Sequence, residues 1–483
     1  MGSDFVTSKL SDIVERVCVG FVGACNKDYT TRELGVPMIR TTNLTGNNIR
    51  YEDLKFVTEE FHLKNLKSQL KRGHILVARH GDNGLPSIYE SDENANCLNV
   101  VIIKPYVNDE YIDNYYLLYA LRTPYVVNQV KSSVGGSVQG VVNTKAIANL
   151  DIPFPERVIR KQIVNQLKTL NDKIELNKQT NQTLVQMAQS LFKSWFVDFD
   201  PVFDNLLAKV DFDLAKLPSD FPDVLLKRMQ KRLLFLSSEV GAVTKIKASQ
   251  HNTSINCLST ADTAVSIHQN FPNEFEHNEQ LGWIPKGWGS KTIDELCIIN
   301  PESWTKESAP DFVNYVDLAN AKHGTVGETI EYSFSEAPSR ARRILHPHDT
   351  IIGVVRPANR SYAYVHEEGV TGSTGFAVVR SNNENYRAFV YFTLTNDDCI
   401  QKFTRIADGA AYPAIKLEDV AKVDCIFSNE IVLEKFEHIV GELMKKVAAN
   451  ELQIKPLTKL RDTLLPKLIS GELITPELEN CNG

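Results

Sequence analysis

The feature that most constrains this 483-residue chain is a seam of ten positions spaced alternately four and three residues apart. Its members are Ile163, Leu167, Leu170, Ile174, Asn177, Asn181, Leu184, Ala188, Leu191 and Trp195. Such spacing, sustained over about 35 residues, is typical of a coiled coil and not of a helix on a globular surface. The sequence therefore predicts a long helix that packs along a second helix, with two asparagines inside the contact.

A second copy of the same seam lies near the C-terminus. Each position follows its counterpart by 273 residues, and the members are Phe436, Val440, Leu443, Val447, Asn450, Ile454, Leu457, Arg461, Leu464 and Leu468. Asn177 of the first seam falls on Asn450 of the second. An offset shared by ten positions, including a polar one, indicates an internal repeat.

The repeat continues upstream of each seam. The segment 135–155 parallels 408–428 at the same offset, so that Gly136 matches Gly409. Farther upstream, "GHILVAR" (73–79) resembles "TIIGVVR" (350–356) at an offset of 277, which places Arg79 and Arg356 at equivalent strand ends. The chain is therefore expected to contain two similar domains, each followed by a helix.

Short β-branched runs alternate with helical stretches inside each domain, which predicts an α/β or α+β fold. The expected layout has a globular domain, a spacer helix, an irregular connecting segment, a second domain, a second helix and a tail, at 1–155, 156–199, 200–280, 281–430, 431–472 and 473–483. Within the connecting segment, "DPVFDNLL" has turn-like composition, 221–240 has helical apolar spacing, and 245–280 is polar and expected to be loop.

The two seams are natural partners for each other within the chain. If a pseudo-twofold axis relates the two halves, the helices form an intramolecular antiparallel coiled coil, and Asn177 faces Asn450. A buried asparagine pair lowers stability but penalises slipped registers, so the pair is expected to set the register. The alternative is that both amides face solvent at a loose crossing. A straight helix over 161–199 would be roughly 58 Å long, which suits a spacer between two contacts on a linear polymer.

The bulk composition narrows the class of protein. Apolar residues make up 42% of the chain and charged residues 23%, with a net charge of −7, so the chain as a whole does not attract nucleic acid. No apolar stretch reaches the roughly 20 residues of a membrane span, and no secretory signal opens the sequence. The eight cysteines are scattered without a C-x-x-C pair, which suits a reducing cytoplasm.

Four motifs resemble the specificity subunits of type I restriction–modification systems. In chain order they are "IPFP" (152–155), "SLFKSWFVDFDPV" (190–202), "LGWIPKGW" (281–288) and "LRDTLLPKLISGEL" (460–473). The resemblance covers nearly the whole chain, and the layout of that family is the layout reached from the repeat. In the second domain "IFSN" (426–429) replaces the more usual proline-containing strand end.

The resemblance implies that each domain is a target recognition domain that reads one half of a split sequence in double-stranded DNA. It implies that the conserved helices set the gap and dock two methyltransferase subunits. It further implies that those subunits and the restriction (motor–nuclease) subunits perform the chemistry with S-adenosylmethionine, ATP and Mg. This chain is then expected to hold no cofactor and to be no enzyme.

The residues themselves give catalysis no positive support. "NPES" (300–303) lacks the second proline and the aromatic ring of an amino-methyltransferase motif, and it is interpreted as a turn. No phosphate-binding loop of the G-x-x-x-x-G-K-[ST] type occurs. "HPHD" (346–349) has no further clustered ligands nearby in sequence, so a solvated turn is favoured over a metal site.

Base edges are read by polar side chains on exposed loops, and phosphates by cations. Candidate DNA-contacting residues lie in loops that recur in both domains. They are Thr41, Thr42, Asn43, Arg79, His80, Asn83, Ser137 and Gln139 in the first domain, and Arg356, Asn359, Arg360, Ser373, Thr374 and Tyr412 in the second.

Each candidate also has a structural alternative. Arg79 and Arg356 could pair with carboxylates, and the loop asparagines could be turn residues. Trp195 and Phe196 are expected to pack between helix and domain or at a subunit interface. Arg461 and Lys467 could dock a partner or be solvated.

Two other functions stay open at this stage. The first is a scaffold whose repeats bind only proteins. The second is a fragment of a fused methyltransferase–nuclease, which would need the cofactor motif that the sequence lacks.

Overall fold

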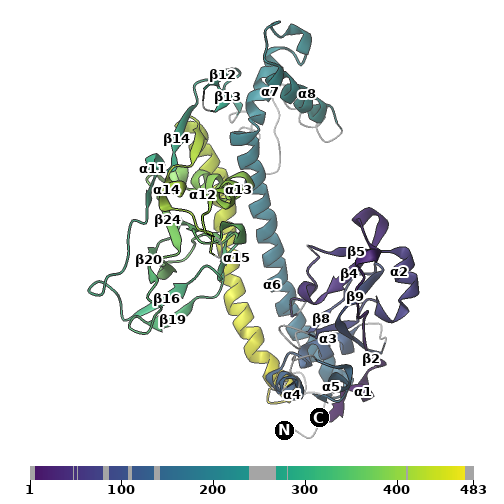
Figure 1. Cartoon of the computed structure of the whole chain (residues 1–483). Coiled ribbons are helices and arrows are strands. Elements are labelled where there is room, and N and C mark those ends of the chain that lie inside the picture. The colour runs from purple at the N-terminus through teal and green to yellow at the C-terminus, as the bar shows by residue number, and fades with distance from the viewer. Residues whose placement is uncertain are drawn as a thin grey trace. The chain divides into compact units, whose positions relative to one another are not determined.

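The computed structural model describes residues 6–46, 48–51, 53–79, 86–106, 111–134, 142–238, 268–279, 281–409 and 412–473. The chain forms two compact units (Figure 1). Unit 1 consists of Met1–Lys178 with Glu451–Gly483, and unit 2 consists of Gln179–Asn450. Each unit therefore contains one globular domain and parts of two long helices.

Unit 1 contains a four-stranded sheet, a five-stranded sheet and a two-stranded pair. The four-stranded sheet has the order β2 (Arg16–Val19), β10 (Val100–Lys104), β7 (Ile75–Ala78) and β8 (Pro86–Ile88). The five-stranded sheet has the order β3 (Tyr29–Thr30), β5 (Lys55–Thr58), β4 (Gly35–Arg40), β9 (Ala95–Leu98) and β6 (Gln69–Leu70). The pair joins β1 (Thr7–Lys9) to β11 (Asp151–Pro153).

The short helices of unit 1 are α1 (Leu10–Ile13), α2 (Glu59–Lys64), α3 (Ile112–Ala120), α4 (Pro124–Val134) and α5 (Thr144–Ala148). The apolar faces of most of them, with β7 and β10, form one core. Ile163 and Leu167 from the first long helix enter that core, as do Leu465 and Leu468 from the second. Both long helices are therefore built into the first domain.

Unit 2 repeats this architecture. Its first sheet has the order β15 (Cys297–Ile299), β24 (Phe376–Ser381), β21 (Thr350–Gly353) and β22 (Tyr362–Tyr364). Its second sheet has the order β19 (Ile330–Ser333), β16 (Phe312–Val316), β23 (Val370–Ser373) and β20 (Ala341–Leu345). The remaining strands pair as β14 (Gly289–Thr292) with β25 (Asp424–Phe427), β12 (Phe275–Asn278) with β13 (Gly282–Pro285), and β17 (Ala321–Lys322) with β18 (Thr325–Val326).

Four short helices of the second domain correspond to α1, α3, α4 and α5 of the first. They are α11 (Ile293–Leu296), α12 (Arg387–Thr395), α13 (Asp397–Ile406) and α14 (Leu417–Ala421). In both units one central pair of the second sheet is parallel, β4 with β9 and β16 with β23. The repeat predicted from sequence is thus present in strand order, pairing direction and helix order, and the mixed α/β fold class is confirmed.

The hydrogen bonds correct one detail of the repeat. The Val142 N–H donates to the Arg79 carbonyl at 3.1 Å, and its counterpart Ile415 donates to Val354 at 2.9 Å. Arg79 is therefore equivalent to Val354, and its predicted equivalence to Arg356 is wrong by two residues. Because side chains in a strand alternate with a period of two, a shift of two residues leaves the inward and outward faces unchanged, so the sequence pattern could not reveal it.

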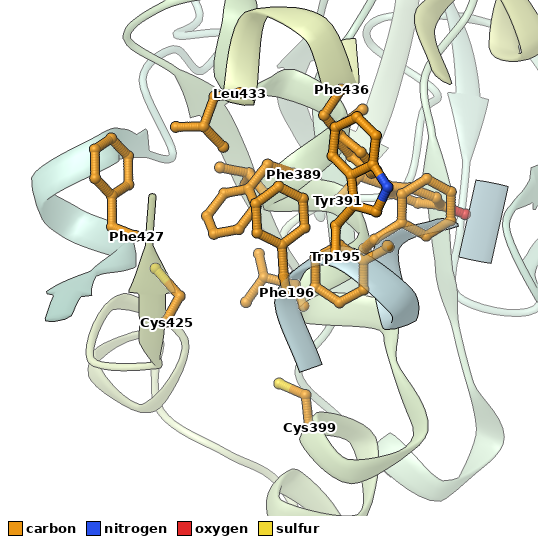
Figure 2. Close-up of a cluster of buried hydrophobic side chains, with 14 of the residues drawn as sticks. Trp195, Phe196, Phe389, Tyr391, Cys399, Cys425, Phe427, Leu433 and Phe436 are labelled. Carbon is orange, nitrogen blue, oxygen red and sulfur yellow. The ribbon is translucent and has the colours of Figure 1, made fainter. Parts of the chain in front are cut away.

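The two long helices are α6 (Arg157–Phe192) and α15 (Glu430–Ser470). Helix α6 ends in a π-helical turn, Lys193–Val197. Trp195 and Phe196 on this turn are buried against Phe389 and Phe436 (Figure 2). The Phe196 ring centroid also lies 6.0 Å from that of Trp288. This confirms that the two aromatic residues pack between helix and domain, and burying each such ring contributes on the order of 1.5–3 kcal/mol.

The helices run antiparallel within each unit, with polar layers between them. In unit 1, the Asn177 amide donates to Gln453 Oε1 at 3.3 Å, and Arg461 donates to Asn171 Oδ1 at 3.1 Å. In unit 2, the Asn450 amide donates to Asn181 Oδ1 at 2.7 Å. The predicted pairing of Asn450 with Asn177 is wrong by one helical turn. The partner of Asn450 is Asn181, four residues farther along the chain.

The reason for this difference is geometric. Asn177 and Asn181 are separated by four residues and so occupy neighbouring turns of the same face. Both side chains are buried. A seam with two adjacent asparagines offers two polar registers one turn apart, and the sequence alone does not choose between them.

The connecting segment is less irregular than its composition suggests. Residues predicted to be turn-like form α7 (Asp200–Lys209), which starts with Pro201 in its first turn, where proline is well tolerated. Helix α8 (Asp223–Ser237) packs on α7, and Arg232 contacts Asp204 at 2.7 Å. Most of the predicted loop 245–280 lies outside the described residues, and β12 lies within its described end.

The buried asparagine pair of unit 2 gives a stability prediction. Asn450→Leu leaves the buried Asn181 Oδ1 without its donor, while Asn181 Nδ2 keeps its hydrogen bond to the Val447 carbonyl. We therefore expect the free energy of unfolding to fall by about 1–3 kcal/mol. The double variant Asn181→Leu/Asn450→Leu should recover this loss, because both polar groups are then replaced. Chemical denaturation measures both effects, and Gln182→Leu, on an exposed position of the same helix, is the control. Equal stability of the single variant and the wild type would contradict the prediction.

Candidate DNA interface

Several predicted residues of the second domain come together in space. We define the loop cluster as Lys322, His323, Arg356, Asn359, Arg360 and Tyr412. Lys322 Nζ donates to the Asn359 carbonyl at 3.3 Å and to Ser361 Oγ at 2.9 Å. The His323 N–H donates to the Arg360 carbonyl at 3.1 Å. Three loops that are far apart in the sequence therefore form one surface.

The centre of the loop cluster is a strained turn. Arg356 and Arg360 flank the short 3₁₀ turn Pro357–Asn359, and both have left-handed backbone conformations, with φ of 51° and 52°. Such a conformation costs roughly 1–2 kcal/mol for a residue with a side chain. Strained backbone of this kind concentrates at functional sites.

The two arginines have different surroundings. The Arg356 N–H donates to the Pro413 carbonyl at 2.7 Å, and the Arg356 guanidinium lies 4.5 Å from the Tyr412 ring centroid. Arg356 is exposed, and Tyr412 is 69% exposed. A cation stacked on an accessible aromatic ring can contact a phosphate, a base edge or an unstacked base.

Part of the hydrogen-bonding capacity of Arg360 is used within the protein. It pairs with Asp397 at 2.7 Å, and this hydrogen bond raises the pKa of Arg360. Burial lowers the pKa of His323, and the charges of Arg360 and Lys322 add to the effect, so His323 is neutral at pH 7. The permanent positive charge of the cluster thus comes from Lys322, Arg356 and Arg360.

Two predicted contact residues are buried and form hydrogen bonds within the protein. Asn43 is 1% exposed, its Oδ1 accepts from the Arg40 N–H at 3.0 Å, and its Nδ2 donates to the Arg50 carbonyl at 3.3 Å. Ser373 is also 1% exposed, and its Oγ accepts from the Gly375 N–H at 3.2 Å. In this structure both side chains hold turns and are not available to DNA.

Neighbouring candidates are more accessible. Thr42 and Thr374 are exposed, and Thr41 is half-buried, with its Oγ1 3.4 Å from the Asn99 carbonyl. Arg79 is half-buried, and its Nε donates to the Val142 carbonyl at 3.3 Å, so this side chain ties two segments of the first domain together. His80, Asn83, Ser137 and Gln139 lie outside the described residues.

Two further residues that were considered for partner docking have other surroundings. Arg461 donates into the helix pair through Asn171 and also contacts Asp462 at 2.7 Å. Its side chain is therefore neither solvated nor presented to a partner. Lys467 lies 3.7 Å from Glu472 and remains half-exposed.

The two motifs weighed for catalysis or metal binding have structural partners. Asn300 of "NPES" has φ of 50°, and its Oδ1 accepts from the Val378 N–H at 2.9 Å. His346 contacts Glu302 at 2.9 Å, and His348 contacts the Tyr364 hydroxyl at 3.0 Å. The described part of the chain contains no group of three or more metal-ligating side chains. Nor does any helix in these described segments have the length and apolarity to span a membrane.

Sequence reasoning missed one basic element. We define the arginine strand as Arg340, which directly precedes β20, together with Arg342 and Arg343 in β20. Arg340 is exposed, and the other two are half-buried. The signal was present, because "SRARR" (339–343) holds three cations in four consecutive positions. The run has no counterpart in the first domain. Loops that recur in both domains therefore do not include it.

Comparisons with known proteins agree with this architecture. A family model described as the type I restriction modification DNA specificity domain matches residues 2–186. The HindI specificity subunit of Haemophilus influenzae is 24% identical over 425 residues, which cover 84% of this chain and 88% of that protein. The MjaIX specificity subunit of Methanocaldococcus jannaschii is 24% identical over 370 residues, covering 75% and 70%.

Among solved structures, the crystal structure of the type I restriction–modification S subunit from M. genitalium is similar, with 13% identity, 97% of each chain covered and a TM-score of 0.49. The family match spans the first domain and most of α6, and the same topology recurs in the second domain. Residues 2–186 therefore match the DNA specificity domain of type I restriction–modification systems, and both relatives, which align with most of this chain, are specificity subunits of such systems.

The different surroundings of two adjacent residues give a prediction. Asn43→Ala removes two buried hydrogen bonds, so we expect it to lower the free energy of unfolding by roughly 1–3 kcal/mol. Thr42→Ala, one residue away and exposed, should change stability by less than about 0.5 kcal/mol. Denaturant titration of the two variants tests this. Similar losses for both would show that burial does not distinguish them.

Proposed function

We propose that this chain is a non-catalytic reader of a split DNA target, in which each domain contacts one half-site. The observation that carries the proposal is the structural repeat. Two domains with corresponding strand orders differ in sequence after equivalent strands, with Thr41-Thr42-Asn43 after β4 and Asp317-Leu318-Ala319 after β16. A repeated scaffold with different contact residues suits two different half-sites, because base identity is read by side chains on a shared frame.

The loop cluster is the proposed contact of the second domain. Its cations can hold phosphates, and Arg356 and Asn359 have the donor and acceptor groups that base edges require. Tyr412 adds an exposed ring beside Arg356. In the first domain the proposed contacts are Thr41 and Thr42, with His80, Asn83, Ser137 and Gln139 remaining expectations from sequence.

The long helices are proposed to set the gap between half-sites and to dock the two methyltransferase subunits. Helix α6 and its terminal turn carry an exposed or half-exposed stripe at Thr180, Thr183, Met187, Ser190, Ser194 and Val197. These positions alternate by three and four residues and include no charge, which is the pattern of a second helix-packing seam. A shallow groove of about 480 Å³ lies along it, lined in part by Met187 and Leu191.

The chemistry is proposed to belong to partner subunits. Methyltransferase subunits would use S-adenosylmethionine, and motor–nuclease subunits would use ATP and Mg, in the cytoplasm. The alternative, a scaffold that binds only proteins, differs in one respect that can be tested. A scaffold would leave no sequence-specific mark on DNA.

Adenine methylation mapping tests the half-site assignment. We expect the chain, expressed with its methyltransferase subunit, to direct methylation to a split motif. Arg356→Ala/Tyr412→Ala should alter or abolish recognition of one half and leave the other half unchanged. Lys231→Ala, exposed on α8, is a control that should keep the whole motif. Loss of both halves together, or no methylated motif from an assembled wild-type complex, would contradict the proposal.

The docking stripe gives a separate prediction. Met187→Glu places a charge in the middle of an uncharged packing surface, so we expect affinity for the methyltransferase subunit to fall at least tenfold, which corresponds to about 1.4 kcal/mol. Gln189→Glu adds the same charge at an exposed position outside the stripe and should have little effect. Analytical ultracentrifugation or calorimetry of the two purified proteins measures the difference. Equal binding by both variants would show that the docking surface does not include this stripe.

A further inference from the structure

The arginine strand has an unusual charge environment. Arg340, Arg342 and Arg343 make no ion pair with a carboxylate among the described residues. Two other arginines of the same domain, Arg360 and Arg380, are paired with carboxylates. Arg380 contacts Asp349 at 2.8 Å and Glu302 at 2.7 Å. The segment 340–343 therefore carries three closely spaced positive charges without a carboxylate partner among the described residues.

Neutral groups hold each of these side chains in place. Arg340 Nε donates to the Tyr315 hydroxyl at 3.0 Å, and Arg343 Nη1 donates to Ser303 Oγ at 3.0 Å. The Arg342 guanidinium lies 4.5 Å from the Phe334 ring centroid. Arg342 Nη1 also donates to the Ala341 carbonyl at 3.1 Å, and Arg343 Nε is buried without a hydrogen-bond partner. Each guanidinium has five N–H donors, so further terminal N–H groups of all three arginines remain for a ligand.

The backbone of β20 helps to present the three side chains. β20 is the last strand of its four-stranded sheet, and its outer edge is hydrogen-bonded to the segment 302–304. Its pairing with β23 shifts register between Ala341 and Arg343. A bulge of this kind inserts an extra residue into one strand. The side chain of that residue then points in a different direction from the one that regular alternation would give. From Arg340 to Arg343 the strand rises by roughly 10 Å, which matches about three base pairs of duplex.

The partner that fits this surface is a polyanion. The chain carries a net charge of −7, so its average field repels DNA, and a local uncompensated cationic strip must overcome that repulsion. Thr374 is exposed and lies beside the arginine strand, because its N–H donates to the Arg340 carbonyl at 2.8 Å. Its hydroxyl adds a neutral donor of the kind that also contacts phosphate oxygens.

We propose that the arginine strand binds consecutive phosphates of the DNA backbone next to the half-site read by the second domain. This inference rests on the proposed DNA-reading function and adds a distinct role, which is anchoring without base recognition. Phosphate contact is favoured over base reading because Arg342 and Arg343 are half-buried along a strand. Three like charges in a row match a repeating anion, whereas base reading requires individually placed donors.

The anchor is asymmetric between the two domains. In unit 1 the strand equivalent to β20 is β6, which pairs with β9 as β20 pairs with β23. The residues just before it are Lys67, which is exposed, and Ser68, which is buried. The first domain thus has one cation at this place, whereas the second domain has three. We therefore expect the second domain to contribute more to the salt dependence of DNA binding.

Salt titration of DNA binding by the assembled methyltransferase complex tests this role. The probes are a duplex with the methylated motif and a duplex without it, followed by fluorescence anisotropy. For Arg340→Gln, and for the triple variant with Arg342→Gln and Arg343→Gln, we expect the slope of log K against log salt to decrease by about 0.9 for each arginine removed. Affinity should fall by the same factor on both duplexes, and the methylated motif should be unchanged.

Two substitutions serve as controls. The triple Arg→Lys variant retains the charges and should restore most of the slope, because a phosphate accepts an ammonium as a point charge. Lys231→Gln on α8 removes one exposed cation elsewhere in unit 2 and should leave the slope unchanged. Thermal unfolding of each variant separates loss of fold from loss of contact, and Arg340→Gln keeps the test valid if the triple variant is unstable, because Arg340 is exposed.

The outcomes distinguish the proposals from each other. An unchanged slope in a folded Arg340→Gln or triple variant would overturn the anchoring role. A motif altered at one base position would also overturn it, in favour of base reading. If the wild-type complex did not prefer the duplex with the motif, the proposed reading function would fail independently of the arginine strand.

Discussion

Burial of the long helices in the domain cores is the interaction on which the rest of the structure depends. In unit 1, Ile163 and Leu468 enter the core of the first domain. In unit 2, Trp195 and Phe436 enter the core of the second (Figure 2). Because each domain includes segments of both helices, no domain can rotate freely on its helix. Loops at the far ends of the strands are thereby held on rigid elements, as a sequence reader requires.

The two domains use this common frame differently. The helix junction of the first domain is an ion pair, with Arg160 contacting Asp113 at 2.7 Å. At the junction of the second domain, the Glu437 carboxylate instead accepts from the Ala388 N–H at 2.7 Å, near the start of α12. The second domain carries the arginine strand, whose three cations have a single counterpart, Lys67, in the first domain, and it carries the strained turn around Pro357. Equivalent topology with different surface chemistry is the expected result when a duplicated domain is selected for two different ligands.

Much of this arrangement could be predicted, and the failures have physical causes. The helices, the repeat and the strands "TIIGVVR" and "GFAVVR" follow from apolar periodicity, which burial imposes directly on sequence. The equivalence of Arg79 with Arg356 failed because strand periodicity is unchanged by a shift of two. Asn43 and Ser373 were chosen as polar loop residues, but their side chains are hydrogen-bonded inside turns. Composition does not reveal whether a loop side chain points outward or back toward its own backbone.

The sequence by itself determined the number of domains, the two long helices and the resemblance to type I specificity subunits, since these depend on periodicity and on motifs that are local in the chain. Only the tertiary structure decided that Asn450 meets Asn181, because two adjacent asparagines permit two polar registers and packing of the surrounding apolar side chains selects one. Tertiary structure also brought Lys322, Arg356 and Tyr412 to one surface and left Arg340, Arg342 and Arg343 without carboxylate partners among the described residues. Charge compensation depends on distances in space, which linear spacing does not contain.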